Sequence, residues 1–522
     1  MTAQNTAKKL LPVGISSFSD LREMDYYYVD KTPLIIDLIT SSRFVFLSRP
    51  RRFGKSLTLD TIAELFAGRK ELFAGLYAEH NWDWNTNYPV IRLSFAGEAE
   101  RHNIEELKAT IYDQLFRNAK HLKIEIPSSK SIGLTFKNLI LDTKEKYQQK
   151  VVILVDEYDK PIIDSLDNTE VATEVRGILK SLYSQIKDLS GSIRFAMLTG
   201  VSKFGQMSLF SGLNNLEDIT LRSDYSALCG YTQEELETVF APELVGVDLE
   251  QVKHWYNGYN WTGESVYNPF DMLLFFKEGC VFDNYWIGTG GNASFLMKLL
   301  KKNRVTLADL QRLASSNLLL NSTDVGNILP LPILFQTGYL TIDEVLQDPS
   351  APRQYKLKFP NYEVRQSFSS LWIDTVLEEN GEDVLNQLRQ CLRAGDTEQL
   401  QVLIRSALAK VPSDAYRRNS IAHAEGYWQS AVGMYFAGAS AEFIMEAASS
   451  RGRADLVAIE QGNVYLFEFK VKQTASAQEA LEQINDKDYA APYRSSAKQI
   501  FAIGVSFDEQ TREIEFAVQK VS

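Results

Sequence analysis

The stretch that decides the fold of this chain reads Phe44-Val-Phe-Leu-Ser-Arg-Pro-Arg-Arg-Phe-Gly-Lys-Ser-Leu57. Its apolar first half is typical of a buried strand, and Gly54, Lys55 and Ser56 open a run with helical spacing of apolar residues. This layout matches the phosphate-loop pattern G-x-x-x-x-G-K-[ST], except that Arg49 stands where the first glycine belongs. A nucleotide site is predicted, because N–H groups at a helix N-terminus favour phosphate, Lys55 reaches the outer phosphates and Ser56 ligates Mg²⁺.

We expect the whole loop to contact the nucleotide. The predicted binding residues are Arg51, Arg52, Phe53, Gly54, Lys55, Ser56 and Leu57. The extra arginines of the loop are expected to add positive charge around the phosphates and so to compensate for the missing glycine. The alternative is an ordinary surface turn, since a Gly-Lys-Ser triplet alone is weak evidence.

The bulk composition describes a chain of several domains. With 522 residues the chain is too long for one core, and 45% hydrophobic with 23% charged residues is ordinary for a globular protein. The formal charge of −12 argues against a chain dedicated uniformly to nucleic acid, although local basic patches remain open. Three widely spaced cysteines predict neither a zinc cluster nor a disulfide framework. No signal peptide or membrane span is expected, so we predict a cytoplasmic protein.

Two further apolar runs end in polar residues that suit the same site. The run Val151-Val-Ile-Leu-Val-Asp-Glu157 lacks alternation, which is typical of a strand buried on both faces of a parallel sheet. Ligands of open α/β sheets lie at the carboxyl ends of strands, so we expect Asp156 to hold Mg²⁺ and Glu157 to polarise an attacking water. A third run over residues 193–200 carries Thr199 near its end, whose hydroxyl either senses the γ-phosphate or caps the following turn.

The alternation of strands and helices makes residues 1–230 an α/β domain. Over residues 231–300 we expect a helical lid, because Thr232 and Glu235 form the capping-box pattern of a helix start. Residues 301–378 combine a helix with two strands joined by a loop, which is typical of a winged-helix-like module. Arg222, just before the lid, is either an arginine finger or part of a plain surface ion pair.

Several motifs in this part of the chain are distinctive. They are Ser48-Arg-Pro-Arg-Arg-Phe-Gly-Lys-Ser56, Val155-Asp-Glu-Tyr-Asp-Lys-Pro161, Leu198-Thr-Gly-Val-Ser-Lys203, Trp255-Tyr-Asn-Gly-Tyr259 and Tyr267-Asn-Pro269. Together they resemble the AAA-ATPase-like family of prokaryotic P-loop proteins over roughly residues 12–290. The resemblance implies that ATP is the ligand and that Arg49 belongs to the family's own version of the loop. It leaves open how fast ATP is hydrolysed.

A second group of candidate residues lies near the C-terminus. The hairpin expected over residues 453–471 turns at Glu460-Gln-Gly-Asn463. Folding it about this turn places Asp455 opposite Glu468. Because side chains alternate along a strand, Lys470 shares the face of Glu468.

Glu425 is expected to join this group from a covering helix. It is the one charge on an apolar stripe formed by Ile421, Glu425, Trp428, Val432 and Tyr435. A carboxylate facing a sheet is costly unless it is paired or bound to a metal. Carboxylates from Glu425, Asp455 and Glu468 would bind Mg²⁺, and Lys470 would orient or activate water near a phosphate. The alternative is an amphipathic hairpin with a cross-strand acid near a lysine.

The order of these residues has a family likeness as well. A helix, Asp455, Glu468-Phe-Lys470 and a following helix with Gln483 and Tyr489 resemble the PD-(D/E)XK nuclease superfamily over about residues 380–522. Ala454 stands where a proline is usual in that superfamily. The resemblance implies a Mg²⁺-dependent nuclease whose catalytic residues are Asp455, Glu468 and Lys470.

The expected fold class is α/β. A P-loop NTPase parallel sheet with a helical lid and a winged-helix-like module precedes an α/β restriction-endonuclease-like domain over residues 379–522. The expected function is cleavage of DNA by a nuclease that ATP gates or positions, with a homo-oligomer formed through the ATPase domain as one route of control. A role against mobile DNA is inferred from the domain partnership alone. Two alternatives stay open: a nucleotide-dependent interaction protein with little catalysis at either site, and an ATPase that acts on protein partners.

Overall fold

The computed structural model describes residues 8–97, 103–127, 131–166, 168–202, 215–286, 296–297, 299–300, 307–310, 314–315, 319, 323–324, 327–409, 421–449, 452–508, 511 and 513–521. The chain forms two compact units. The first comprises residues 1–285 and 313–361, and the second comprises residues 286–312 and 362–522.

A five-stranded sheet of order β2-β3-β4-β1-β5 organises the first unit. All of its neighbouring strands pair in parallel, as the sequence predicts. The apolar runs form the buried central strands because their side chains meet packed helices on both faces. The strands are β1 (Phe44–Ser48), β2 (Val90–Ser94), β3 (Val151–Asp156), β4 (Ile193–Gly200) and β5 (Glu217–Asp218).

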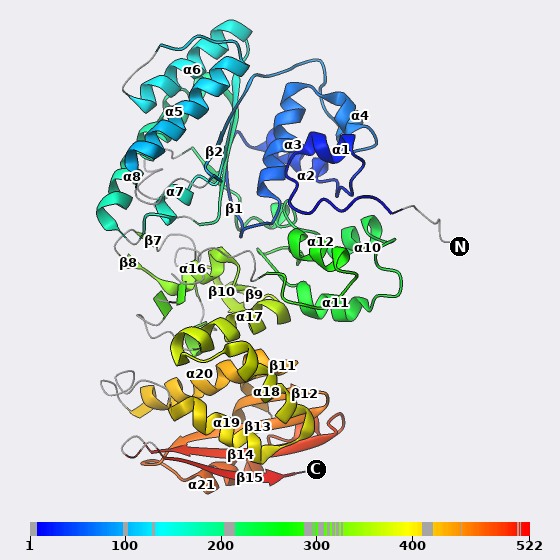
Figure 1. The fold of residues 1–522 in the computed structure, drawn as a ribbon, viewed down its shortest axis with the longest axis vertical. Helices are drawn as coiled ribbons and strands as arrows, with labels where there is room; N and C mark the ends of the chain where they lie inside the picture. Colours follow the sequence, from blue (N-terminus) through cyan, green and yellow to red (C-terminus); the bar gives the residue numbers. More distant parts are fainter. Residues whose placement is uncertain are drawn as a thin grey trace. The chain divides into compact units, whose positions relative to one another are not determined.

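Helices lie on both sides of this sheet (Figure 1). One layer contains α1 (Phe18–Glu23), α2 (Thr32–Ser41), α3 (Lys55–Ala67) and α4 (Ala78–Asn81). The other contains α5 (Ile104–His121), α6 (Ile132–Tyr147), α7 (Lys160–Ile163) and α8 (Thr169–Asp188). Helix α3 packs against β2, β3 and β4, which brings its N-terminus to the carboxyl ends of the parallel strands.

A small helical module follows the sheet. Its helices are α10 (Gln233–Val239), α11 (Leu249–Tyr256) and α12 (Pro269–Lys277). The predicted capping box is confirmed, because Thr232 and Glu235 bond reciprocally at the start of α10. Tyr27 and Val29, from the segment ahead of the sheet, belong to the hydrophobic core of this module. The N-terminal segment and the helical module are therefore packed as one body.

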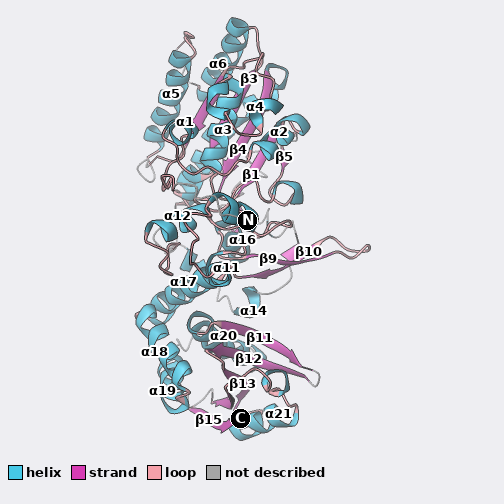
Figure 2. Ribbon diagram, turned by 90° about the vertical axis from the view of Figure 1, so that its right-hand side faces the viewer, coloured by secondary structure: helices cyan, strands magenta, loops and turns pink. Residues whose placement is uncertain are grey.

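The rest of the first unit consists of a helix and a small antiparallel sheet. Helix α16 (Pro330–Thr337) precedes β9 (Thr341–Leu346) and β10 (Gln354–Lys358), which Figure 2 shows as a hairpin. Strand β6 (Ala314–Ser315) pairs with β10 to give the order β6-β10-β9. Pro332 to Gln336 of α16 are buried. Helix α16 contains no Lys, Arg or His, so it does not present a basic recognition surface.

The second unit is built on a mixed sheet of order β11-β12-β13-β14-β15, in which only the β13–β14 pair is parallel. The strands are β11 (Glu442–Ser449), β12 (Gly452–Glu460), β13 (Asn463–Val471), β14 (Gln499–Phe507) and β15 (Ile514–Lys520). The helices are α17 (Tyr362–Trp372), α18 (Gly381–Ala394), α19 (Thr397–Ala409), α20 (Ile421–Ala439) and α21 (Ala477–Asp486).

Helices α20 and α21 cover opposite faces of this sheet. The ring of Phe467 lies 4.8 Å from that of Phe436 in α20. The neighbouring Leu466 packs in one cluster with Leu481 and Ile484 of α21. Alternation along β13 therefore gives each helix its own set of side chains. Among the described residues, no helix has the length and hydropathy needed to cross a membrane.

Candidate functional sites

The loop between β1 and α3 is closed by its own lysine. Lys55 Nζ donates to the carbonyl oxygens of Arg49 at 3.0 Å and Pro50 at 2.8 Å. Gly54 takes a left-handed conformation with φ 91° just before α3, where a glycine is least strained. Lys55 is only 5% exposed, and burial lowers the pKa of its ammonium. The loop thus wraps around a buried cation at the N-terminus of a helix, which is the geometry of an anion site.

Arg49 turns away from this anion site. Its guanidinium donates to the carbonyl oxygens of Thr220 at 2.9 Å and Tyr225 at 3.2 Å, and it lies 4.2 Å from the ring centroid of Trp261. The residue is 1% exposed, and burial lowers the pKa of its guanidinium to about 10. The expectation that all the extra arginines surround the phosphates is therefore wrong for Arg49. Its side chain instead anchors the loop to Thr220, Tyr225 and Trp261.

Asp156 joins the loop to the two central strands. Ser56 Oγ donates to Asp156 Oδ2 at 2.5 Å, and Thr199 Oγ1 donates to Asp156 Oδ1 at 2.8 Å. The parallel register places the ends of β3 and β4 side by side, and α3 starts against them. A hydroxyl and a carboxylate are hard oxygen donors, which fit Mg²⁺ beside a bound phosphate. These three predicted residues therefore lie together.

Glu157 follows Asp156 in a left-handed conformation with φ 49°. This backbone geometry is uncommon for a residue with a side chain and re-aims Glu157 at the end of the strand. Burial raises the pKa of its carboxyl, and the nearby Lys55 opposes that shift. Glu157 also lines the cavity beside the loop.

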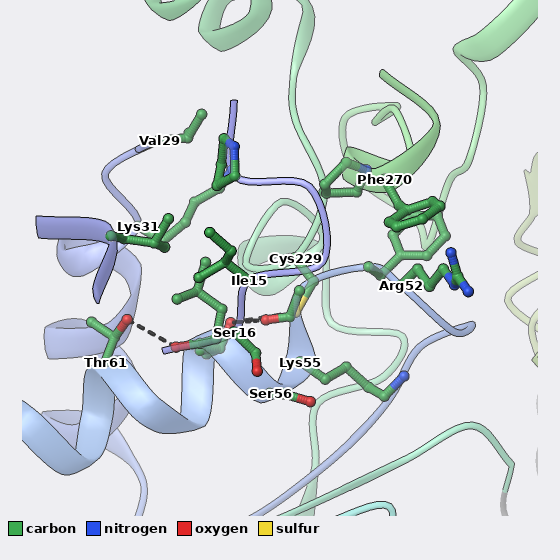
Figure 3. A pocket seen from close by; sticks show the side chains of 18 of the residues that line it. Ile15, Ser16, Val29, Lys31, Arg52, Lys55, Ser56, Thr61, Cys229 and Phe270 are labelled. Atoms are coloured by element: carbon green, nitrogen blue, oxygen red, sulfur yellow. Dashed lines mark hydrogen bonds between the residues drawn. The ribbon is translucent and has the colours of Figure 1, made fainter. Parts of the chain in front are cut away.

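A cavity of about 860 Å³ extends from the loop toward the N-terminal segment (Figure 3). Its lining includes Arg52, Phe53, Gly54, Lys55, Ser56 and Leu57 of the predicted set. Apolar walls come from Ile15, Val29 and Phe270, and they suit a planar base rather than a phosphate. Arg51 is outside this lining. Phe53 is fully buried against Tyr259, so its ring holds the loop in place.

Lys31 is a cavity residue that the sequence did not identify. Its Nζ lies 2.6 Å from both carboxylate oxygens of Glu235 in α10. Burial lowers the pKa of Lys31, and Glu235 opposes the shift. The capping-box pattern pointed to Glu235 as a local cap, but no signal in the sequence connects it with Lys31, since their pairing depends on the tertiary fold.

Arg222, the other residue considered near the lid, forms ion pairs with Glu217 and Asp224. Burial is slight and the hydrogen bonds to these two acids raise the pKa of its guanidinium. Of the two interpretations of Arg222, the structure therefore matches the surface ion pair and not an arginine finger directed at a phosphate.

The second candidate site lies on the β12–β13 hairpin. The paired stretch runs from Glu460 opposite Asn463 to Leu456 opposite Phe467, and Asp455 and Glu468 are the next residues on the two strands. Asp455 Oδ2 accepts the N–H of Phe469 at 2.7 Å, which fixes the carboxylate against β13.

Glu468 is the centre of this group. Lys470 Nζ donates to Glu468 Oε1 at 2.7 Å, and the side chain of Gln483 in α21 donates to the same oxygen. Glu468 is 2% exposed, while the Lys470 side chain is 22% exposed. Gln483 also lies 3.4 Å from the Tyr489 hydroxyl. The motif residues of the strand and those of the following helix therefore meet at one carboxylate.

The helix that carries Glu425 is not the helix that covers Glu468. Glu425 lies on α20, whose Phe436 packs on the Phe467 face of β13, whereas Glu468 faces α21. The side chain of Glu425 lies outside the described residues, so its role as a metal ligand stays a prediction. Helix α20 nevertheless reaches the other acid of the hairpin, because Gln429, one turn after Glu425, donates to the carbonyl oxygen of Asp455 at 3.4 Å.

The donor set at the hairpin fits a magnesium ion. Within the described part of the chain, no three His, Cys, Asp or Glu side chains cluster as a metal site. Mg²⁺ nevertheless keeps several waters and binds through only one or two carboxylates. Asp455 and Glu468, on neighbouring strands, supply two, and Lys470 supplies a cation beside them.

These geometries define a protein with a P-loop domain and a carboxylate–lysine site on a mixed sheet. The family described as "Predicted AAA-ATPase" matches residues 12–210, and the family described as "PD-(D/E)XK nuclease superfamily" matches residues 423–517. The chain therefore carries a predicted AAA-ATPase-like domain and a C-terminal domain of the PD-(D/E)XK nuclease superfamily.

A relative that shares both domains is described as an uncharacterized protein in the vnfD 5' region of Azotobacter chroococcum mcd 1. It is 45% identical to this chain over 511 residues, which cover 97% of the chain and 98% of the relative. The chain belongs to the same family as that protein. No solved structure matches the chain.

Proposed function

We propose that this chain is a Mg²⁺-dependent DNA nuclease controlled by ATP. The observation that carries the proposal is the meeting of Asp455, Glu468 and Lys470 on one hairpin, with Lys470 Nζ 2.7 Å from Glu468 Oε1. The superfamily match covers the same segment. A nuclease domain implies a nucleic acid as substrate, and we take DNA to be that substrate.

Each residue of the hairpin has a distinct task in this proposal. Asp455 and Glu468 hold Mg²⁺, which supplies positive charge for the phosphate and acidifies a bound water. Lys470, which donates to Glu468, would orient the attacking water or the phosphate. Gln483 holds the carboxylate of Glu468 in position from α21. Glu425 is retained as a further ligand to be tested.

ATP binds at the loop of the first unit in this proposal. Lys55 and the N-terminal N–H groups of α3 bind the phosphates, and Ser56 with Asp156 hold Mg²⁺. Glu157 activates water, and Thr199 senses the γ-phosphate through its bond to Asp156. Arg51 and Leu57 remain predicted contacts.

The intervening modules transmit this control. We interpret residues 231–300 as a helical lid and residues 301–378 as a winged-helix-like module that packs rather than reads DNA, since α16 buries its apolar residues. The ATPase domain is proposed to form a homo-oligomer. The described cysteines are free thiols, which suits the cytoplasm. A role against mobile DNA is proposed from the domain pairing.

A second candidate is a nucleotide-dependent interaction protein with little catalysis. The observation that favours it concerns Lys55, because its ammonium donates to the carbonyl oxygens of Arg49 and Pro50 and is therefore held by the loop itself. A site that binds ATP strongly and hydrolyses it slowly suits a switch better than a motor.

The test uses supercoiled plasmid DNA with Mg²⁺, with and without ATP. The wild-type chain is expected to cut, Lys470→Ala to lose cutting, and Lys472→Ala to behave as wild type, because Lys472 is an exposed lysine paired with Glu515. ATP is expected to change the rate in the wild type and not in Lys55→Ala. A wild type that binds ATP and never cuts supports the interaction protein, and turnover unaffected by DNA supports an ATPase acting on proteins.

A further inference from the structure

Arg52 is directed at the lid module and not at the N-terminus of α3. Its Cζ lies 3.8 Å from the ring centroid of Phe270, the second residue of α12, and Figure 3 shows the two side chains together. Both residues line the nucleotide cavity. Arg52 also has φ 64°, a left-handed conformation that an arginine adopts only when its surroundings hold it there. A loop cation is thus held by an aromatic ring of another module.

The residue after Phe270 explains why a cation belongs in this place. Asp271 is 1% exposed, and its Oδ1 has no hydrogen-bond partner in the described structure. Burial raises the pKa of the Asp271 carboxyl well above its usual range, and Arg52 is the charge that opposes this shift. The Phe270 ring contacts the Arg52 guanidinium, and the buried Asp271 carboxyl lies near enough to interact with its charge without a hydrogen bond at Oδ1; we call these two residues the arginine seat.

The arginine seat and the phosphate site compete for one side chain. A ring face and a buried acid offer a guanidinium modest attraction, whereas the outer phosphates of a nucleotide carry several charges and accept bidentate bonds. Arg52 precedes Lys55 by three positions in the same loop, so both start from the same turn of backbone. Arg52 is therefore expected to contact the outer phosphates when they are present and the arginine seat when they are absent.

We propose that Arg52 is a nucleotide sensor that moves from the arginine seat of Phe270 and Asp271 to the outer phosphates of bound ATP. The inference rests on the proposed nucleotide site at Lys55. It makes the lid helix α12 responsive to the bound phosphates, because Arg52 contacts Phe270 of this helix only when the outer phosphates are absent. Adenosine monophosphate, which lacks the outer phosphates, leaves Arg52 on Phe270.

The experiment is a double-mutant cycle on the full chain, with affinities for ATP and AMP measured by calorimetry. Phe270→Leu removes the competing ring and is expected to tighten ATP by about 2- to 30-fold, the range of a cation–π contact. The effect of Phe270→Leu on AMP affinity is also measured and is subtracted from its effect on ATP affinity, because the effect on AMP reports direct contact of the ring with the nucleotide. Arg52→Gln is expected to weaken ATP by about tenfold and to cancel the effect of Phe270→Leu.

Two further variants keep the test decisive. Asp271→Asn keeps the shape of the seat, replaces its titratable carboxyl by a neutral amide and is expected to tighten ATP only when Arg52 is present. Arg117→Gln is the matched control, because Arg117 is an exposed arginine of α5 paired with Asp113, and it is expected to change nothing. Far-UV circular dichroism identifies a variant that fails to fold. If Phe270→Leu fails to fold, the effect of Asp271→Asn on ATP affinity, measured with and without Arg52→Gln, tests the sensor instead.

The outcomes separate the inference from the proposed function. If the wild type binds ATP, Lys55→Ala does not, and Phe270→Leu has the same effect with and without Arg52, the sensor is overturned and the nucleotide site stands. Equal tightening of ATP and AMP also overturns the sensor. If the wild type binds no ATP, the nucleotide site and the sensor fail together.

Discussion

Lys55 Nζ donates to the carbonyl oxygen of Arg49, six positions earlier and 3.0 Å away, so the last cation of the loop binds the backbone of its first residue. The bond uses only the main chain of Arg49, and its side chain points to the opposite side, toward Trp261. Arg52 and Gly54 are the positions of the loop with positive φ, whereas Arg49 is not. The first position of this loop therefore does not require a glycine.

Replacing Arg49 by the glycine of the general pattern is expected to harm the protein. Arg49→Gly removes the hydrogen bonds to Thr220 and Tyr225 and the contact with Trp261, and it takes a buried donor away from the carbonyl of Thr220. We expect a loss of about 3 kcal/mol or more in the free energy of unfolding. Urea denaturation measures it. A variant with wild-type stability and tighter ATP binding would show that Arg49 is only a degraded glycine position.

Lys55→Ala is expected to weaken ATP binding by about 10- to 100-fold, the value of a charge-assisted hydrogen bond in a buried site. Calorimetry or a fluorescent ATP analogue measures the dissociation constant. Lys70→Ala is the control, because Lys70 is exposed in a short turn of helix well past the loop. Equal affinities in the wild type and Lys55→Ala would remove the loop as the nucleotide site.

Glu157 predicts the pH dependence of ATP turnover. A general base must be ionised, and burial raises the pKa of this carboxyl, so turnover is expected to rise with pH over a range above that of an ordinary glutamate. The neutral form is favoured in the folded chain. The contribution of Glu157 to the free energy of unfolding is therefore fully present below the ordinary pKa of glutamate, and it is lost as the pH rises through the raised pKa of the folded chain.

Glu157→Gln tests both effects. It is expected to abolish the rising limb of the pH–rate profile and to raise the melting temperature most at neutral and alkaline pH. An unchanged pH profile would assign the base to another residue. Retention of ATP binding in the same variant controls for damage to the loop.

The hairpin residues are expected to separate metal binding from catalysis. Glu468→Gln removes a ligand charge and is expected to reduce both Mg²⁺ affinity and cleavage. Lys470→Ala is expected to reduce cleavage by about 100-fold or more while Mg²⁺ still binds, because the lysine acts beside the metal. Cleavage rates on plasmid and Mg²⁺ titration measure the two effects. Full activity of Lys470→Ala would assign Lys470 to packing only.

The pairing of Lys31 with Glu235 makes a prediction about stability. Removing one partner leaves a largely buried charge, so Lys31→Met is expected to cost about 2 kcal/mol or more. Adding Glu235→Gln is expected to restore part of that loss, since the neutral amide still accepts at the capping box. Chemical denaturation of the two single variants and the double variant measures the coupling. Additive effects would mean that the two residues do not act as a pair.

Local patterns predicted the elements of this chain because local physics decides them. The unbroken apolar runs became the central strands β1, β3 and β4, and the capping box formed at Thr232 as its spacing requires. The hairpin register followed from its Gly-containing turn, which brought Asp455 to Glu468. Ser56, Asp156 and Thr199 met because parallel strands end at one edge of a sheet.

The sequence by itself determined where the candidate residues lie on strands, turns and helix starts, since motif spacing fixes their places. Only the tertiary structure decided where the remaining side chains point. Arg49 turned to Trp261, Arg52 to Phe270 and Lys31 to Glu235. The partners of these three cations lie on segments far away in the chain. Their directions depend on burial and on long-range packing, which no local pattern encodes, so two arginines of one basic loop, Arg49 and Arg52, contact different parts of the fold.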